Sequence, residues 1–319
     1  MKKLFKTLFM SAALLAGSLS FTACNSHKKT IGIIQFGTHE SLNDCYKGML
    51  AGLSDVLGEE FNNYTIDHQN SNFDAASSAA QANTFVSKRA SIIGAIATPS
   101  AMAAASAAKG TIPVVYCAVS DPASAGLTTM ENVTGSSDLL DFDGQLNLIK
   151  TFVPDVDKIG VLYTLSEANS VSQIETLKTK AKALNIDIVT QAITNASEIP
   201  TATDTLLNKD VDCLTNLTDN TVVGALDIIL AKTNAKKIPV FGSEIDQVKA
   251  GCLASASLDY VALGQKTGEI MGKVLKGEAK ASNDIAIKIE DSFNCYSLKV
   301  AKDLGINLPD VQDMQNVDK

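Results

Sequence analysis

The stretch I-I-G-A-I-A-T-P-S-A-M-A-A-A-S-A-A, from Ile92 to Ala108, decides the fold of this chain. It opens with a short apolar run that predicts a buried strand and continues as an alanine-rich segment that predicts a helix. Thr98 or its neighbour suits the N-cap, and Pro99 suits the first helical turn, where its missing N–H is not needed. Such a turn leaves free backbone N–H groups at the carboxyl end of the strand, where ligands bind in open α/β sheets.

The strand–turn–helix unit is repeated along the first half of the chain, and the second half repeats the same series of units. Apolar runs alternate with helical periodicity from Thr30 to Ala118, which predicts βαβ units and a parallel sheet. The segment 158–163 repeats the pattern of 30–35, and Thr218-Asp219-Asn220 stands where Thr98-Pro99-Ser100 stood in the first half. We therefore predict an α/β fold of two Rossmann-like lobes, each a parallel sheet flanked by helices.

The elements after residue 258 are too few for a third domain, so we expect them to complete the two sheets. Lobe 1 is predicted from residues 30–137 plus 259–288, and lobe 2 from 138–258 plus 289–309, before a loose polar tail at 310–319. The chain then crosses between the lobes three times. Three crossing segments predict a hinge, and a hinge implies closure on something in the cleft.

The first residues carry an export signal. Three lysines precede an apolar run, and Phe21-Thr22-Ala23-Cys24 has the form of a lipobox. We predict a signal peptide over 1–23, lipidation of Cys24 and a tether over 24–29; a plain signal peptide with a chance cysteine is the alternative. No later apolar run is long enough to span a bilayer. The protein is then exported and lipid-anchored to the membrane, facing the periplasm or the cell exterior.

The composition argues against several classes of function. A net charge of −8 does not favour a nucleic-acid partner. The three histidines are scattered, and the five cysteines after Cys24 lack the close paired spacing of a metal site, so neither metal nor cofactor is predicted. Five is odd, which leaves at least one free thiol; we interpret these cysteines as small buried hydrophobic residues. Glu244 and Asp246 form the only candidate catalytic pair, and we predict no catalytic residue.

Polar side chains gather where the predicted strands end, and no Lys or Arg belongs to these turns. Hydroxyls and amides at helix N-termini suit a carboxylate, acidic side chains suit an ammonium, and aromatic rings suit an apolar side chain. The candidates for the carboxylate are Thr98, Ser100, Asn169 and Ser170. Those for the ammonium are Asp138, Asp219 and Glu244, and those for the apolar side chain are Phe36, Phe142 and Tyr260. The mixture predicts a zwitterionic ligand. Helix capping by the polar residues, above all Asp219, and core packing by Phe36 are the competing interpretations.

The chain resembles the type I periplasmic-binding-protein-like lipoproteins of ABC transporters, in the group with tryptophan- and tyrosine-binding members. The resemblance spans about residues 28–309. It is carried by I-G-I-I-Q-F, I-A-T-P-S-A, A-V-S-D-P, N-V-T-G-S-S-D-L-L, E-A-N-S-V, T-D-N-T-V, I-P-V-F-G-S-E and L-D-Y-V-A-L-G. Glu244 stands where Asp is more usual, and the turn after Phe36 does not align; both departures bear on the ligand's identity.

The resemblance implies a cleft site for an amino acid, often aromatic, and delivery to a membrane permease driven by a cytoplasmic ATPase. It implies no catalytic residues. The matched motifs place at the cleft Thr98, Ser100, Ser120, Asp121, Asp138, Asn169, Ser170, Asp219 and Asn220. We therefore expect a monomeric solute-binding lipoprotein of an ABC importer. A surface sensor or adhesin built on the same clamshell, or a different small solute, is the alternative.

Overall fold

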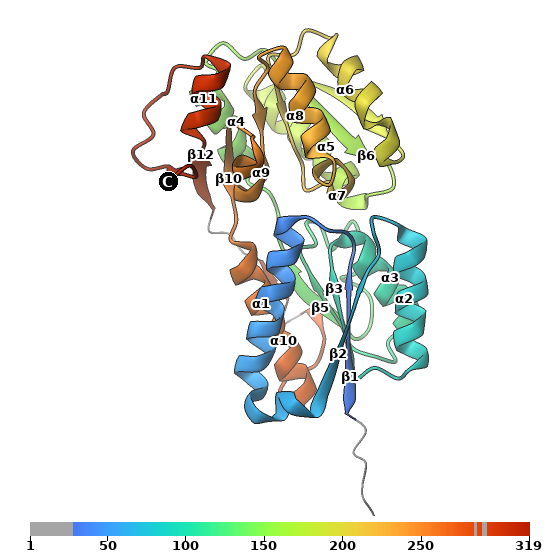
Figure 1. Cartoon of the computed structure of the whole chain (residues 1–319). Coiled ribbons are helices and arrows are strands. Elements are labelled where there is room, and N and C mark those ends of the chain that lie inside the picture. Colours follow the sequence, from blue (N-terminus) through green and yellow to red (C-terminus); the bar gives the residue numbers. More distant parts are fainter. Residues whose placement is uncertain (1–27, 284–285, 289–291) are drawn as a thin grey trace, which may run out of the picture.

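Two α/β lobes are stacked end to end and joined by three segments of chain (Figure 1). The computed structural model describes residues 28–283, 286–288 and 292–319. The predicted signal peptide, Cys24 and most of the tether lie outside these residues. The predicted fold class is confirmed: each lobe contains a parallel sheet with helices packed against it.

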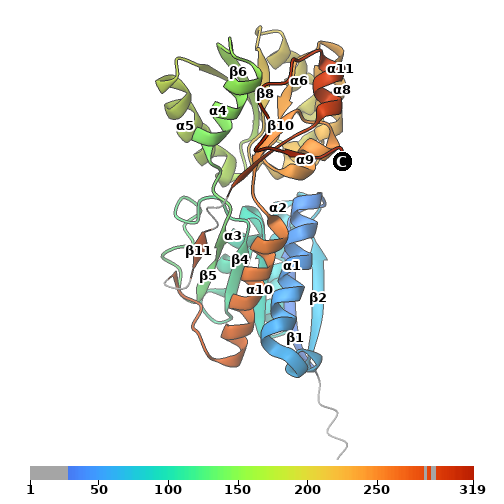
Figure 2. The ribbon, with the colours of Figure 1, turned by 90° about the vertical axis from the view of Figure 1, so that its left-hand side faces the viewer.

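Lobe 1 is built on a six-stranded parallel sheet with the strand order β11-β5-β4-β3-β1-β2. Helices α1 and α10 cover one face, and α2 and α3 cover the other (Figure 2). Its elements are β1 (Lys29–Gln35), α1 (Glu40–Leu57), the 3-10 helix η1 (Gly58–Asn63), β2 (Tyr64–Asn70), α2 (Ala75–Ser87), β3 (Ile92–Ile96), α3 (Thr98–Ala108), β4 (Val114–Cys117), β5 (Val133–Ser137), α10 (Tyr260–Lys276) and β11 (Ile287–Lys288).

Lobe 2 combines a four-stranded parallel sheet, β7-β6-β8-β9, with a small mixed sheet, β10-β12-β13. Its elements are α4 (Phe142–Phe152), β6 (Lys158–Thr164), α5 (Ala168–Ala183), β7 (Asp187–Ile193), η2 (Ala196–Glu198), α6 (Ile199–Leu207), β8 (Cys213–Thr215), α7 (Asn220–Val223), α8 (Leu226–Ala235), β9 (Val240–Phe241), α9 (Ile245–Ala250), β10 (Ala254–Ser257), β12 (Phe293–Tyr296), α11 (Leu298–Leu304) and β13 (Gln315–Asn316).

The helical segment after Asp219 is divided, since Gly224 and Ala225 separate the short α7 from α8. One expectation for lobe 2 is wrong. The tail expected to be loose carries β13, which pairs with β12, and the carboxylate of Asp318 accepts hydrogen bonds from Ser297 Oγ and Lys299 N. These contacts fix the end of the chain on lobe 2.

The chain passes between the lobes after β5, after β10 and between β11 and β12. The five cysteines of the described residues are buried free thiols, which agrees with their interpretation as small buried hydrophobic residues. Within the same residues, no helix is long and apolar enough to cross a membrane.

Helices α1 and α10 pack closely side by side because both carry glycines along their contact. A Cβ atom on Gly48 would lie 2.1 Å from the carbonyl oxygen of Val261, and one on Gly268 would lie 2.1 Å from that of Met49. Both helices begin at the cleft between the lobes (Figure 1). The close contact therefore brings the start of α1 and the start of α10 together beside the cleft.

We predict that Gly268→Ala destabilises the protein by roughly 1–3 kcal/mol, because the new methyl group forces α1 and α10 apart. Alanine's higher helix propensity, about 1 kcal/mol, offsets only part of this loss. Urea unfolding measures the free energy. Ser54→Ala, at an exposed position of α1, is the control and should stay within about 0.5 kcal/mol of the parent. Equal stability of both variants would contradict the close contact.

Candidate functional site

A small polar cavity lies between the two lobes. Its volume is about 20 Å³, which is room for roughly one water molecule. Its walls are formed by His39, Ser41, Leu42, Ala118, Asp138, Thr218, Asn220, Val223, Ser243, Glu244, Gln247 and Tyr260. Among these described wall residues there is no Lys or Arg. The small volume of the cavity shows that the lobes are closed. A ligand of amino-acid size enters only if the lobes separate or the walls rearrange.

Asp138 forms the wall on the hinge side of the cavity. It follows directly on β5, and its carboxylate accepts hydrogen bonds from the Tyr260 hydroxyl and from Ser120 Oγ, both at 2.9 Å. Burial raises the pKa of Asp138 to about 6, against the lowering effect of these two donors. A cationic group that reached this carboxylate would relieve the desolvation of its charge.

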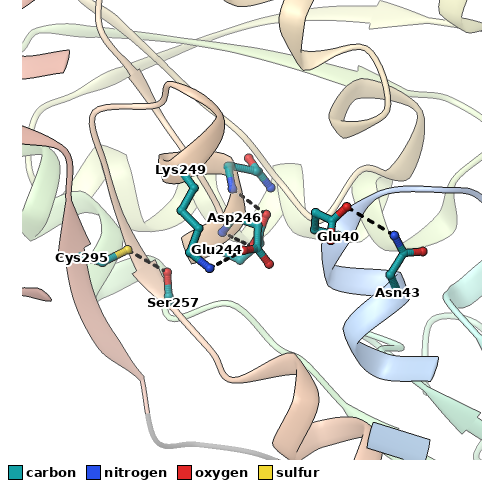
Figure 3. A network of polar contacts seen from close by, with 8 residues as sticks. Glu40, Asn43, Glu244, Asp246, Lys249, Ser257 and Cys295 are labelled. Atoms are coloured by element: carbon teal, nitrogen blue, oxygen red, sulfur yellow. Dashed lines mark hydrogen bonds and ion pairs between the residues drawn. The ribbon is translucent and has the colours of Figure 1, made fainter. Parts of the chain in front are cut away.

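Glu244 supplies a second carboxylate from lobe 2. It is the N-cap of α9, where its oxygens accept hydrogen bonds from the backbone N–H groups of Asp246 at 2.6 Å and Gln247 at 3.0 Å. Burial raises the pKa of Glu244 to about 7. Figure 3 shows Glu244 and Asp246 facing the start of α1, with Asp246 paired to Lys249 at 2.7 Å.

Asp219 takes the role of a helix cap. Its carboxylate accepts hydrogen bonds from Thr164 N at 2.6 Å, Thr164 Oγ1 at 2.8 Å and Val222 N at 2.9 Å. It does not belong to the wall of the cavity. From its sequence position, Asp219 was a candidate partner for an ammonium group. Its side chain instead points into the interior of lobe 2, and Glu244 is the acidic residue that lobe 2 contributes to the wall of the cavity.

The start of α7 carries a second buried acid, Glu167. Its oxygens accept four hydrogen bonds, from the backbone N–H groups and the side chains of Asn220 and Thr221, at 2.7 to 2.9 Å. Burial and the neighbouring charge of Asp219 raise the pKa of Glu167 to about 8. Two acids thus occupy the backbone donors of one helix N-terminus, which removes it as a site for an anionic ligand.

The N-termini of α3 and α5 differ from those of α7 and α9. In the described structure neither helix receives a side-chain cap from its N-cap residue, Ala97 or Glu167. At α3 the buried Thr98 Oγ1 has no hydrogen-bond partner, and at α5 the same holds for Asn169 Oδ1. Free backbone donors and an unpartnered hydroxyl make α3 suited to a ligand's carboxylate.

Hydrogen bonds join the described parts of the two lobes across the cleft. Ser120 Oγ lies 2.7 Å from Thr218 Oγ1, and His39 Nε2 lies 3.3 Å from Asn220 Oδ1. At the rim, Ser172 Oγ donates to Asp121 Oδ2 at 2.6 Å. Closure is therefore held by hydroxyl, amide, imidazole and carboxylate groups.

The predicted site residues fall into five groups. Asp138, Asn220, Glu244 and Tyr260 line the cavity. Ser120 and Asn169 contact the wall residue Thr218, Asp121 stands at the rim, and Thr98, Ser100 and Ser170 are buried at helix starts. Phe36, Phe142 and Asp219 lie in the lobe interiors. Whether each contacts a ligand stays a prediction.

Four residues at the site were not among the residues predicted from the sequence. His39, Val223 and Gln247 line the cavity, and Glu167 binds the start of α7. Only Gln247 stands in a recognisable pattern, because it follows the acidic candidate Glu244 by three residues, and its backbone N–H donates to that side chain. His39 and Glu167 lie in turns that were expected to face the cleft, but their partners come from distant parts of the chain.

Two hinged α/β lobes with a polar cavity between them define a clamshell solute-binding protein. The chain belongs to the family described as ABC transporter substrate binding protein, which it matches over residues 30–314. It is 40% identical, over 281 residues, to the tyrosine-binding protein of Clostridioides difficile (strain R20291), covering 84% of this chain and 80% of that protein.

Solved structures agree with this assignment. The ABC domain in complex with L-Trp from Streptococcus pneumonia is 33% identical with a TM-score of 0.84, covering 89% of this chain and 96% of that chain. A ligand-free, open substrate-binding protein with adhesive properties from Clostridium difficile is 34% identical with a TM-score of 0.65, covering 91% and 99%. At nearly equal identity, the better fit to the L-Trp complex agrees with a closed arrangement of the lobes.

We predict that Ser172→Ala shifts the unliganded protein toward an open form. The variant loses the rim hydrogen bond to Asp121, and a loss of about 1 kcal/mol changes the closed-to-open ratio roughly fivefold. Small-angle scattering detects the opening as a larger radius of gyration. Thr179→Ala is the control, because its hydroxyl bonds only within α5, to the carbonyl of Glu175. Identical scattering from the two variants would exclude a rim latch.

We also predict that the unliganded protein loses stability as pH rises from 6.5 to 8. The folded pKa values of Glu244 and Glu167, about 7 and about 8, lie above the ordinary value for Glu. The folded protein therefore holds protons that the unfolded chain has released, so stability falls with rising pH in this window. His39, whose pKa burial lowers to about 4, acts in the opposite direction only below pH 6.5.

Thermal unfolding at several pH values measures this effect. In Glu244→Gln the decline between pH 6.5 and 8 should be shallower, because one of the two titrating groups is gone. A melting temperature that rises over the same interval in the parent protein would contradict the burial of these carboxyls as ionisable groups.

Proposed function

We propose that this protein binds an aromatic amino acid between its lobes, outside the cytoplasmic membrane, and delivers it to the permease of an ABC importer. The observation that carries the proposal is the opposite character of the helix N-termini at the cleft. Acids cap α7 and α9, whereas α3 and α5 keep free donors and unpartnered buried oxygens. A zwitterion matches such a division.

The ammonium group is assigned to the acidic side of the cavity. Asp138 and Glu244 approach it from the hinge and from α9, and no described cavity residue is a lysine or arginine that would compete. Asn169 Oδ1 is a third acceptor without a partner. An ammonium between these oxygens forms charge-assisted hydrogen bonds, which are stronger than neutral ones.

The carboxylate group is assigned to the start of α3. Thr98 supplies an unpartnered hydroxyl, and the first backbone N–H groups of α3 lack a side-chain acceptor from the N-cap residue. These donors and the positive end of the helix dipole favour an anion. Asn169 was expected to help here, but its Nδ2 donates to Thr218 O at 2.7 Å, so this amide suits the ammonium better.

The aromatic side chain is inferred from the relatives. One is a tyrosine-binding protein and another was solved in complex with L-Trp. Rings already gather beside the cavity, where His39 stacks on Phe73 with centroids 6.5 Å apart and Phe36 meets Phe73 edge-on at 6.0 Å. Aromatic pairs favour both geometries, so the neighbourhood suits another ring.

Lipid anchoring through Cys24, export and a monomeric state complete the proposal. Export and anchoring rest on the lipobox-like sequence. No catalytic residue, cofactor or metal is part of it. A second candidate, surface adhesion or sensing, is favoured by the relative described as having adhesive properties. That role is compatible with ligand binding in the same cleft.

We predict that L-tyrosine, L-tryptophan or L-phenylalanine raises the melting temperature. A ligand present at 100 times its dissociation constant stabilises by about 2.7 kcal/mol. The chain contains no Trp, so bound L-tryptophan is the only source of tryptophan emission in a purified complex. L-leucine and a dicarboxylic amino acid serve as controls for side-chain selectivity. A panel in which none of the aromatic amino acids shifts the melting temperature would refute the proposal.

Asp138→Asn provides the matched test of the ammonium site. It keeps the shape of the side chain but removes the charge, so we expect roughly tenfold weaker binding or more, since a hydrogen bond between charged groups contributes about 1.5–3 kcal/mol. Asp143→Asn, on the exposed first turn of α4, is the control and should bind like the parent. Calorimetric titration measures both.

A further inference from the structure

Glu167 restricts how Asn220 is oriented. Glu167 Oε2 accepts from Asn220 N at 2.9 Å and from Asn220 Nδ2 at 2.7 Å, while Oε1 accepts from Thr221 N and Thr221 Oγ1. The two backbone groups can only donate. If Glu167 carries a proton, the Thr221 hydroxyl can accept it without any group turning over. Oε2 thus stays an acceptor and keeps Nδ2 of the amide on its side.

The other end of the amide then faces lobe 1. With Nδ2 held by Glu167, Oδ1 of Asn220 points across the cleft and lies 3.3 Å from His39 Nε2. A carbonyl oxygen can only accept a hydrogen bond, so Nε2 must be the donor. Burial lowers the pKa of His39 to about 4, so the ring is neutral at neutral pH and carries one proton.

The second ring nitrogen of His39 is left without a partner. Nδ1 is shielded from solvent and has no hydrogen-bond partner in the described structure, although His39 belongs to the wall of the cavity. An unpaired buried acceptor is unfavourable, and a donor from a ligand would remove that penalty. Phe73 is stacked on the ring, the charge of Asp246 acts on it, and Glu244 lines the same cavity.

We propose that Glu167 is a positioning residue: through Asn220 it keeps the single proton of His39 on Nε2, and so reserves Nδ1 as an acceptor for an N–H donor of the ligand. Glu167 itself does not touch the ligand. The last step rests on the proposed function, because the donor is taken to be the ligand's ammonium group. The first step concerns the unliganded protein alone and can be tested without any ligand.

The tautomer of His39 is read directly by two-bond ¹H–¹⁵N correlation spectra of the ¹⁵N-labelled protein, with the His39 signals assigned by their loss in His39→Gln. We expect the Nε2–H tautomer in the parent protein. In Glu167→Gln the amide nitrogen can face residue 220 or Thr221 Oγ1, and in the first orientation the Asn220 amide turns over and presents Nδ2 to His39. The Nδ1–H tautomer should therefore gain population.

Asn220→Ala keeps the proposal testable if Glu167→Gln does not fold. This variant retains the backbone N–H groups that Glu167 caps but removes the acceptor for His39, so the ring should populate both tautomers. Glu167→Asp, whose shorter carboxylate still only accepts, should keep more of the Nε2–H form than Glu167→Gln. An Nδ1–H ring in the parent, or a tautomer that neither Glu167→Gln nor Asn220→Ala alters, would overturn the relay.

The ligand contact is tested separately with L-tyrosine and L-tryptophan. Binding should move the Nδ1 resonance of the parent, and Glu167→Gln should weaken binding roughly tenfold, as expected when a donor replaces an acceptor at a charged group. If an amino acid binds by thermal shift but leaves Nδ1 unchanged, the contact with His39 is wrong and the proposed function stands. If none binds, the proposed function fails while the tautomer result still decides the role of Glu167.

Discussion

The closed cleft depends on burying carboxylates that form no ion pair within the described part of the chain. Asp138 and Glu244 line the cavity, while Glu167 and Asp219 lie behind it, and each is at most 3% exposed. Removing a charge from water is unfavourable unless hydrogen bonds or an opposite charge replace the lost solvation. Here helix N-termini and hydroxyl donors provide part of that replacement, and the raised pKa values of these acids reflect the part that is missing. A cationic group from a ligand is the natural complement.

The placement of these acids at some helix N-termini and not at others determines the orientation in which a zwitterionic ligand would bind. Helix N-termini would ordinarily all favour anions, and a ligand would have no preferred orientation among them. Acids at α7 and α9 cancel that preference in lobe 2, whereas α3 retains it in lobe 1. Asp138 lies at the hinge, and its partner Ser120 also touches Thr218 of lobe 2. An ammonium bound there is therefore next to the contacts that form on closure.

The sequence predicted the lobes better than the site. Repeated βαβ periodicity identifies two sheets, because each buried strand and each amphipathic helix is a local pattern. Whether an acidic side chain at the end of a strand faces the cavity or the lobe interior depends on contacts with residues that are distant in the sequence. Asp219 and Glu244 both follow a strand and precede a helix, and both are caps, but only Glu244 also borders the cavity. Thr164, which belongs to β6, holds Asp219 inward through its backbone N–H and its hydroxyl, and no spacing within the chain predicts this contact.

The close contact between the glycines of α1 and α10 keeps the lobe 1 side of the cleft in one arrangement when the lobes open and close. α10 follows the second crossing of the hinge, so its first residue, Tyr260, would move with the hinge if the helix were loosely packed. Gly48 and Gly268 let the two helices approach until backbone meets backbone, which resists sliding and tilting. Tyr260 and His39 are therefore held in a constant relation at the floor of the cleft. Closure then consists of lobe 2 bringing Asn220 and Thr218 to a surface that is already formed.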